Sequence, residues 1–264
     1  MKGRRGDNGH GKVDEFVDFI ETARKRAADV PSPDFTAGPT DPLMPGGDLP
    51  DFRPLLVGYE ILERIDRGGQ AVVYRAVQAK PRRQVAIKIM LGGATASADQ
   101  RRRFESEVEM ISRLQHPNLV TIHDSMVVDN CFFYTMPYVN GARIDDHVLL
   151  HDRSVEQIVG LMIKICRAIN HCHQKGVIHR DIKPSNILVD GDGEPHLIDF
   201  GLARDMGSAR DPSRTYSISG QVIGTLYYLS PEQAAGRSKS ADTRTDVYGL
   251  GLTLYQLLTQ QFPY

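Results

Sequence analysis

The order of two periodicities most constrains how this chain can fold. From residue 58 onward, apolar residues first recur at every second position, in segments 59–65, 71–77 and 85–90, and later recur at helical spacing. Strand patterns that precede a run of helices are typical of an α+β domain. We therefore predict a small β-rich first part and a mainly helical second part.

Two later segments carry the clearest helix signals. Ser154 and Gln157 match a capping box, and Gly176 follows the last apolar turn, so we predict that a helix lies between them. The segment 246–258 is apolar nearly all round, which predicts a buried helix.

Composition changes near residue 57. Residues 1–12 are rich in glycine and charge, residues 13–28 place apolar residues at helical spacing, and residues 31–54 contain seven prolines. We interpret 1–57 as an N-terminal tail with a short amphipathic helix and a proline-rich linker, and 58–264 as the folded domain. The alternative is that the amphipathic helix docks on a partner or on the domain itself.

Charge and composition exclude several classes of protein. The 32 basic and 33 acidic residues give a net charge of −1, which argues against a nucleic-acid or anionic-membrane binder. The sequence has no run of about 18 apolar residues, so we predict no membrane span in it. The basic N-terminus lacks the apolar stretch of a signal peptide. Three scattered cysteines do not form a disulfide framework, so we expect a cytoplasmic protein.

Glu107 is a misfit in its predicted helix, because it lies within the apolar stripe between Phe104 and Ile111. An inward carboxylate needs a cation or becomes neutral. Lys88, on the neighbouring strand 85–90, is the natural partner. The alternative is a partly exposed Glu107 at the edge of the stripe.

A second predicted hairpin carries candidate metal ligands. Residues 187–189 and 196–198 flank the turn 190–193, which brings Asn186 and Asp199 together at the open end of the hairpin. Two such oxygen ligands suit Mg²⁺. Asp181 adds a carboxylate on the same loop, although an aspartate in a loop is more often a turn former.

Six short motifs together resemble the eukaryotic-type (Hanks-type) Ser/Thr protein kinases, and the stretches GGQAVVYRA (68–76) and VIGTLYYLSPEQAAG (222–236) most resemble the bacterial branch of that family. The six motifs occur in the family's order, as VAIK (85–88), HRDIKPSN (179–186), DFG (199–201), GT (224–225), SPE (230–232) and DVYGLG (246–251). The resemblance spans residues 58–264 and implies a bilobal kinase fold that uses ATP and Mg²⁺ to phosphorylate serine and threonine in proteins. Since the family continues for several helices beyond residue 264, we expect this domain to be incomplete at its C-terminus, with apolar residues of the last helix left in water.

The resemblance implies a role for each matching residue. Asp181 corresponds to the catalytic aspartate, Asn186 and Asp199 to the metal ligands, and Lys183 to the lysine at the γ-phosphate. Lys88 would hold the α- and β-phosphates with Glu107 orienting it, and Thr225 would contact Asp181 and Lys183. Asp246 would brace the catalytic loop, and His179 would pack behind Phe200.

The resemblance also implies where the rest of the nucleotide binds. The backbone around Gly68 and Gly69 would cradle the phosphates, and the adenine would meet a hinge after Met136. The residues expected to contact adenine are Pro137 and Val139 through their backbone, and Val73, Ala86 and Leu188 through their side chains.

Phosphorylation of the segment after Phe200 is the expected means of activation. Ser217 and Ser219 match the phosphorylated pair of the bacterial branch, and Arg180 and Arg204 are two cations that a phosphate could bind.

The chain departs from the family in its phosphate loop, where Asp66 and Ala71 replace the first and third glycines. We expect Asp66 to face solvent, with a modest loss of nucleotide affinity. A nucleotide-binding scaffold without turnover, or an inactive kinase fragment, is the alternative function.

Overall fold

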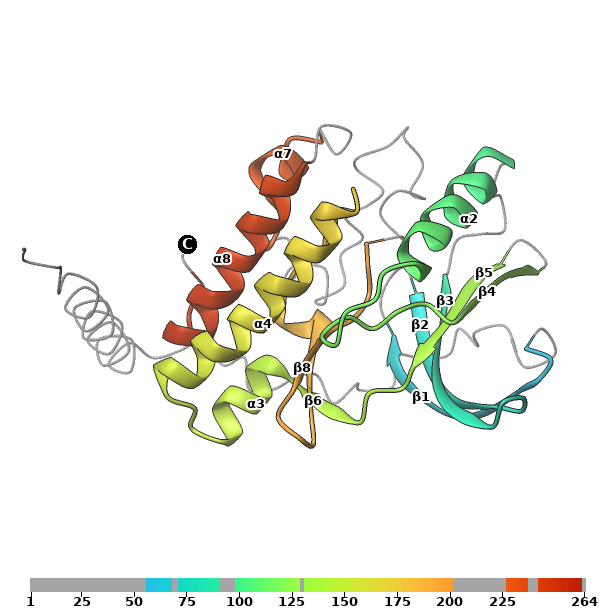
Figure 1. Cartoon of the computed structure of the whole chain (residues 1–264), viewed down its shortest axis with the longest axis horizontal. Helices are drawn as coiled ribbons and strands as arrows, with labels where there is room; N and C mark the ends of the chain where they lie inside the picture. The colour runs from blue at the N-terminus through green and yellow to red at the C-terminus, as the bar shows by residue number, and fades with distance from the viewer. Residues whose placement is uncertain are drawn as a thin grey trace, which may run out of the picture.

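The computed structural model describes residues 56–67, 71–90, 98–128, 131–201, 227–236 and 242–262. Its first part is a five-stranded antiparallel sheet, seen at one end of Figure 1. The strands, in their spatial order, are β1 (Tyr59–Arg67), β2 (Ala71–Gln78), β3 (Arg83–Met90), β5 (Cys131–Pro137) and β4 (Asp124–Val128). The predicted strands 59–65, 71–77 and 85–90 are confirmed.

Strand β3 shows why this sheet has two different faces. Val85, Ile87 and Ile89 are buried in one apolar cluster, while Ala86 and Met90 belong to another. Alternation along a strand sends neighbouring side chains to opposite faces, so Lys88 shares its face with Ala86 and Met90.

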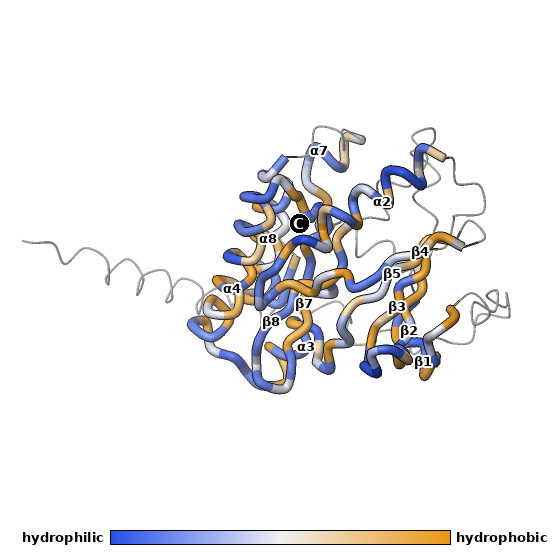
Figure 2. Tube along the Cα trace, turned by 45° about the vertical axis from the view of Figure 1, so that its right-hand side comes forward, coloured by the Kyte–Doolittle hydropathy of each residue, from blue (hydrophilic) through white to orange (hydrophobic). Residues whose placement is uncertain are grey.

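Helix α2 (Ala98–Ser112) covers that second face. Phe104 of α2 and Phe132 of β5 pack with ring centroids 4.9 Å apart, whereas Arg101, Arg102 and Arg103 are exposed. Figure 2 shows the same contrast, with hydrophilic N-terminal turns in α2 and largely hydrophobic strands beneath it.

The second part is mainly helical and is built around two long helices. Helix α4 packs against α8, and Figure 1 shows them side by side. The capping box of Ser154 and Gln157 is formed, and Gly176 closes the helix with φ +75°. The elements are β6 (Gly141–Arg143), α3 (Ile144–Leu150), α4 (Val155–Gln174), the 3-10 turn η3 (Pro184–Asn186), β7 (Ile187–Asp190), β8 (Pro195–Leu197), α7 (Pro231–Ala234) and α8 (Thr243–Thr259).

Of the two expectations about α8, its burial on nearly all sides is wrong in part, whereas the exposure of some of its apolar residues is confirmed. Gly249, Thr253 and Leu257 are buried, but Val247 is 60% exposed and Tyr255 is 41% exposed. Helix α4 and the loop before η3 pack against one side of α8, so the apolar residues on its other sides are not all buried.

The α+β, two-part architecture is confirmed. The predicted tail helix and linker lie outside the described residues. Within the ranges that the structure describes, no helix has both the length and the apolar character needed to cross a membrane.

Candidate functional site

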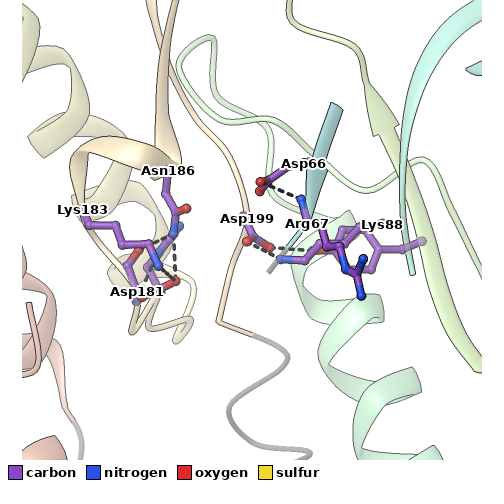
Figure 3. Close-up of polar contacts among 9 residues, drawn as sticks. Asp66, Arg67, Lys88, Asp181, Lys183, Asn186 and Asp199 are labelled. Atoms are coloured by element: carbon purple, nitrogen blue, oxygen red, sulfur yellow. Dashed lines mark hydrogen bonds and ion pairs between the residues drawn. The ribbon is translucent and has the colours of Figure 1, made fainter. Parts of the chain in front are cut away.

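Strands β3 and β5 place a lysine and a tyrosine side by side. Lys88 and Tyr134 are direct partners in the register of the two strands and project from the same face. The Lys88 ammonium forms an ion pair with Oδ2 of Asp199, shown in Figure 3. The Tyr134 hydroxyl donates a hydrogen bond of 2.7 Å to Oδ1 of the same carboxylate. Both oxygens of Asp199 are therefore held by residues of the sheet.

The β7–β8 hairpin brings the predicted metal ligands together. Ile187 pairs with Leu197, and the N–H of Ile198 donates to the carbonyl of Asn186 at 2.9 Å. Asp199 follows directly, so it lies one residue past the level of Asn186. The predicted approach of these two residues at the open end of the hairpin is confirmed for the backbone, and their role as metal ligands stays a prediction.

Asp181, Lys183 and Asn186 form a compact polar group on one loop. Nδ2 of Asn186 donates to Oδ2 of Asp181 at 2.9 Å and to the Asp181 carbonyl at 2.7 Å. Nζ of Lys183 lies 3.0 Å from Oδ2 of Asp181. Figure 3 shows the three side chains pointing toward one another. The arrangement places the Lys183 ammonium beside the Asp181 carboxylate. A carboxylate can accept a proton, and a neighbouring cation can stabilise negative charge that develops during a reaction.

The backbone of this loop is held by a buried carboxylate on α8. Asp246 accepts hydrogen bonds from the N–H groups of His179 at 2.9 Å and Arg180 at 2.7 Å. Nε2 of His173, on α4, donates to the same carboxylate at 2.7 Å. The predicted bracing role of Asp246 agrees with these bonds, whereas His173 was not singled out as its partner.

Two non-glycine residues of the site have left-handed backbone conformations. Arg180 has φ +66° and Asp199 has φ +64°. Such conformations cost free energy and persist only where the surroundings enforce them. Around Arg180 these include the Asp246 carboxylate on its N–H and Nε2 of Gln233, which donates to its carbonyl at 2.9 Å.

His179 is a packing residue, as predicted. It is fully buried, and its ring lies 4.7 Å from that of Phe200. Burial lowers the pKa of His179 and outweighs the opposing effect of the carboxylates of Asp246, Asp181 and Asp199. The imidazole is therefore neutral near neutral pH.

The structure pairs Lys88 with a carboxylate that was not predicted for it, that of Asp199. Glu107 is partly exposed and lines a pocket with Arg180, Phe200 and Gly201. The cause of the pairing is geometric, since Asp199 follows the hairpin directly onto the face of β3 that carries Lys88. A role for Glu107 in orienting Lys88 stays a prediction.

Most of the expected adenine-contacting residues lie on strands, and Val139 lies in the short segment between β5 and β6. Ala86 and Met136 are register partners and are both buried, while Val73 and Val139 are partly buried against the same cluster. Pro137 ends β5, and Leu188 lies on β7. Their contact with a nucleotide stays a prediction.

Some predicted site residues lie outside the described ranges: Gly68, Gly69, Arg204, Ser217, Ser219 and Thr225. Asp66 is described and is exposed, as predicted, and its Oδ1 accepts a hydrogen bond from the N–H of Arg67 at 2.8 Å.

Tyr134 was missed by the sequence reasoning. It is buried, and burial together with the charge of Asp199 raises its pKa well above the ordinary value, so the hydroxyl keeps its proton and donates. The available signal was a hydroxyl at an inward position of β5, between Phe132 and Met136.

Comparison with known proteins gives the same assignment over most of the chain. Residues 59–264 match the model of the protein kinase domain. The chain is 38% identical over 210 residues to the serine/threonine-protein kinase PrkC of Bacillus subtilis, and 33% identical over 213 residues to PknB of Mycobacterium leprae. Each alignment covers 78% of this chain but only 31% and 33% of the respective relative, so the chain spans about a third of their length.

A solved structure supports the fold. The crystal structure of the Mycobacterium tuberculosis PknI kinase domain matches with a TM-score of 0.61 and 27% identity, covering 79% of this chain and 77% of that one. With both the sequence match and the arrangement of strands, helices and polar groups in place, this chain belongs to the protein kinase domain family.

Proposed function

We propose that this chain is the catalytic domain of an ATP-dependent serine/threonine protein kinase, which transfers the γ-phosphoryl group of ATP to protein hydroxyls. The observation that carries the proposal is the grouping of Asp181, Lys183 and Asn186 on one loop, joined through the β7–β8 hairpin to the Lys88–Asp199 pair (Figure 3). Its relatives PrkC and PknB are named as serine/threonine-protein kinases. We place the domain in the cytoplasm.

Each residue of the group has a task in phosphoryl transfer. The Asp181 carboxylate accepts the proton of the substrate hydroxyl. The hydroxyl oxygen attacks the γ-phosphorus of ATP, and ADP leaves. Lys183, 3.0 Å from that carboxylate, keeps positive charge beside the transferring group. When ATP binds, Lys88 gives up its ion pair with Asp199 and contacts the nucleotide phosphates instead.

The donor set fits Mg²⁺, because Asn186 and Asp199 offer an amide and a carboxylate oxygen from adjoining positions of one hairpin. When bound, the ion neutralises charge on the phosphates. The backbone at Gly68 and Gly69 and the Thr225 hydroxyl would complete the contacts to nucleotide and catalytic loop.

Radiolabelled ATP with Mg²⁺ and a generic acceptor protein tests the proposal. Asp181→Asn keeps the shape of the side chain but removes the base, and should lower the transfer rate about 10²–10⁴-fold. Lys88→Met and Asp199→Ala should each lower it by at least about 10²-fold. Asp146→Asn, on an exposed position of α3, is the matched control and should leave the rate unchanged. Transfer at the wild-type rate in Asp181→Asn would contradict the assignment and favour a scaffold without turnover.

We further propose that phosphorylation of Ser217 and Ser219 activates the domain. A phosphate there would bind Arg180, directly before Asp181, and Arg204 through charge-assisted hydrogen bonds. Mass spectrometry after incubation with ATP should find phosphate on these serines, and the double variant Ser217→Ala with Ser219→Ala should lose activation. The matched control is Ser208→Ala with Ser213→Ala. Equal loss of activity in both double variants, or phosphate found only in residues 1–57, would rule the idea out.

A further inference from the structure

Tyr134 carries a polar group where an apolar one would fill the same space. Its side chain is 2% exposed and belongs to the apolar cluster that also contains Phe132, Met136 and Phe104. A buried hydroxyl costs free energy unless it finds a hydrogen-bond partner, and phenylalanine would bring the same ring without that cost. The partner that Tyr134 finds is Oδ1 of Asp199, at 2.7 Å.

The strand that carries Tyr134 is a rigid support. Tyr134 is register partner to Lys88 on one side and to Ser125 on the other, so β5 is held between β3 and β4. Asp199, by contrast, follows the end of β8 and has a left-handed backbone conformation. The hydrogen bond therefore ties a carboxylate in an irregular segment to the interior of a sheet.

The bond fixes the orientation of the carboxylate and leaves it able to bind a cation. Two carboxylate oxygens offer about four lone-pair positions, of which Tyr134 and Lys88 use one each. Hydrogen bonds to ligating side chains hold them in the binding orientation, and their loss typically lowers metal affinity about 10–100-fold.

We infer that Tyr134 is a positioning residue for the metal-binding carboxylate of Asp199, acting through its hydroxyl; this rests on the proposed function, in which Asp199 holds Mg²⁺. The Tyr134 hydroxyl therefore contributes to the gain in ATP affinity that Mg²⁺ provides. It does not contribute to the adenine contacts or to the folding of the sheet.

Isothermal titration calorimetry of the full chain with ATP, in excess Mg²⁺ and again in EDTA, separates these contributions. Tyr134→Phe removes only the hydroxyl. It should weaken ATP binding about tenfold in Mg²⁺ and leave binding in EDTA unchanged, and the Mg²⁺ concentration at half-saturation should rise by a similar factor.

Tyr59→Phe is the matched control. The Tyr59 hydroxyl also donates to an aspartate, Oδ2 of Asp124, at 3.3 Å, in the same sheet but away from Asp199. This variant should bind ATP like the wild type under both conditions.

Asp199→Ala separates the inference from the function on which it rests. If Asp199→Ala keeps the wild-type gain in affinity from Mg²⁺, the metal assignment in the proposed function is wrong. If Asp199→Ala loses that gain but Tyr134→Phe matches Tyr59→Phe, only the inference about Tyr134 is overturned. Weaker binding of Tyr134→Phe in EDTA as well would mean a structural role, and tighter binding in Mg²⁺ would mean that the hydroxyl opposes the metal; either result overturns it.

Discussion

The Asp246 carboxylate accepts hydrogen bonds from three donors: the N–H groups of His179 and Arg180 and Nε2 of His173. A fully buried charge is tolerable only when it is paired or hydrogen-bonded, and here both of its oxygens are used. The consequence for function is indirect. His179 and Arg180 immediately precede Asp181, so Asp246 helps to set the position of Asp181, the proposed catalytic base.

His179 makes the stability of the domain depend on pH. Burial lowers its pKa, so the folded protein resists protonation, while the unfolded chain takes up a proton near the ordinary value of about 6.5. Above about pH 6.5, His179 is neutral in both states and does not favour unfolding. Below that pH, the unfolded chain binds a proton that the folded protein does not, so the free energy of unfolding falls by up to about 1.4 kcal/mol per pH unit. Urea unfolding between about pH 7.5 and about pH 5.5 should show a falling free energy of unfolding.

His179→Phe is the control for this pH dependence, because it keeps an aromatic ring against Phe200 but cannot titrate. Its free energy of unfolding should change less over the same interval. Equal slopes for the two proteins would assign the dependence to other groups.

At the scale of elements, α8 packs against the loop that carries Asp181 at Gly249, a residue without a side chain. A Cβ at Gly249 would lie 3.0 Å from both Cβ and the carbonyl oxygen of Ile182, the residue after Asp181. Gly251, one half-turn further on, is exposed and has open space around it. The two glycines of one helix thus differ in what they permit, and the buried one sets how closely α8 approaches the loop.

Alanine at these two positions should have opposite effects. In the interior of a helix, glycine to alanine gains about 1 kcal/mol of stability from helix propensity. Gly251→Ala should show that gain. Gly249→Ala should lower the free energy of unfolding by about 1 kcal/mol instead, because overpacking against a held backbone typically costs about 1–3 kcal/mol.

Denaturant unfolding of both variants, with the transfer rate measured in parallel, checks this expectation. Gly249→Ala should also transfer phosphate more slowly, since Ile182 moves together with Asp181. Equal stabilisation by both alanines would show that the contact at Ile182 relaxes without cost.

At the scale of the whole molecule, the architecture was predictable because it follows from local patterns. The alternation in β3 sets its two faces, the Ser154 capping box begins α4, and the hairpin turn at 190–193 sets the approach of Asn186 and Asp199. Each of these features depends on neighbours in the sequence, which is why its location could be read directly.

The missed features all depend on how distant segments meet. The ion pair of Lys88 with Asp199 was not predicted, because Asp199 follows a hairpin and lies 111 residues further along the chain. Tyr134 looked like one more apolar residue of β5, because nothing local reveals which carboxylate its hydroxyl reaches.

The pairing of Lys88 with Asp199 bears on whether metal and nucleotide would bind separately or together. Before nucleotide arrives, the cation that would bind phosphate and the anion that would bind metal satisfy each other. A phosphate compound alone would take Lys88 and strand a partly buried carboxylate, and a divalent ion alone would strand the ammonium; breaking one half of such a pair is costly. A complex of metal and nucleotide would give Lys88 a phosphate and Asp199 a cation at the same time, and so would keep both charges paired. Under the proposed function, each of the two ligands would therefore favour the binding of the other, and either one alone would bind less well.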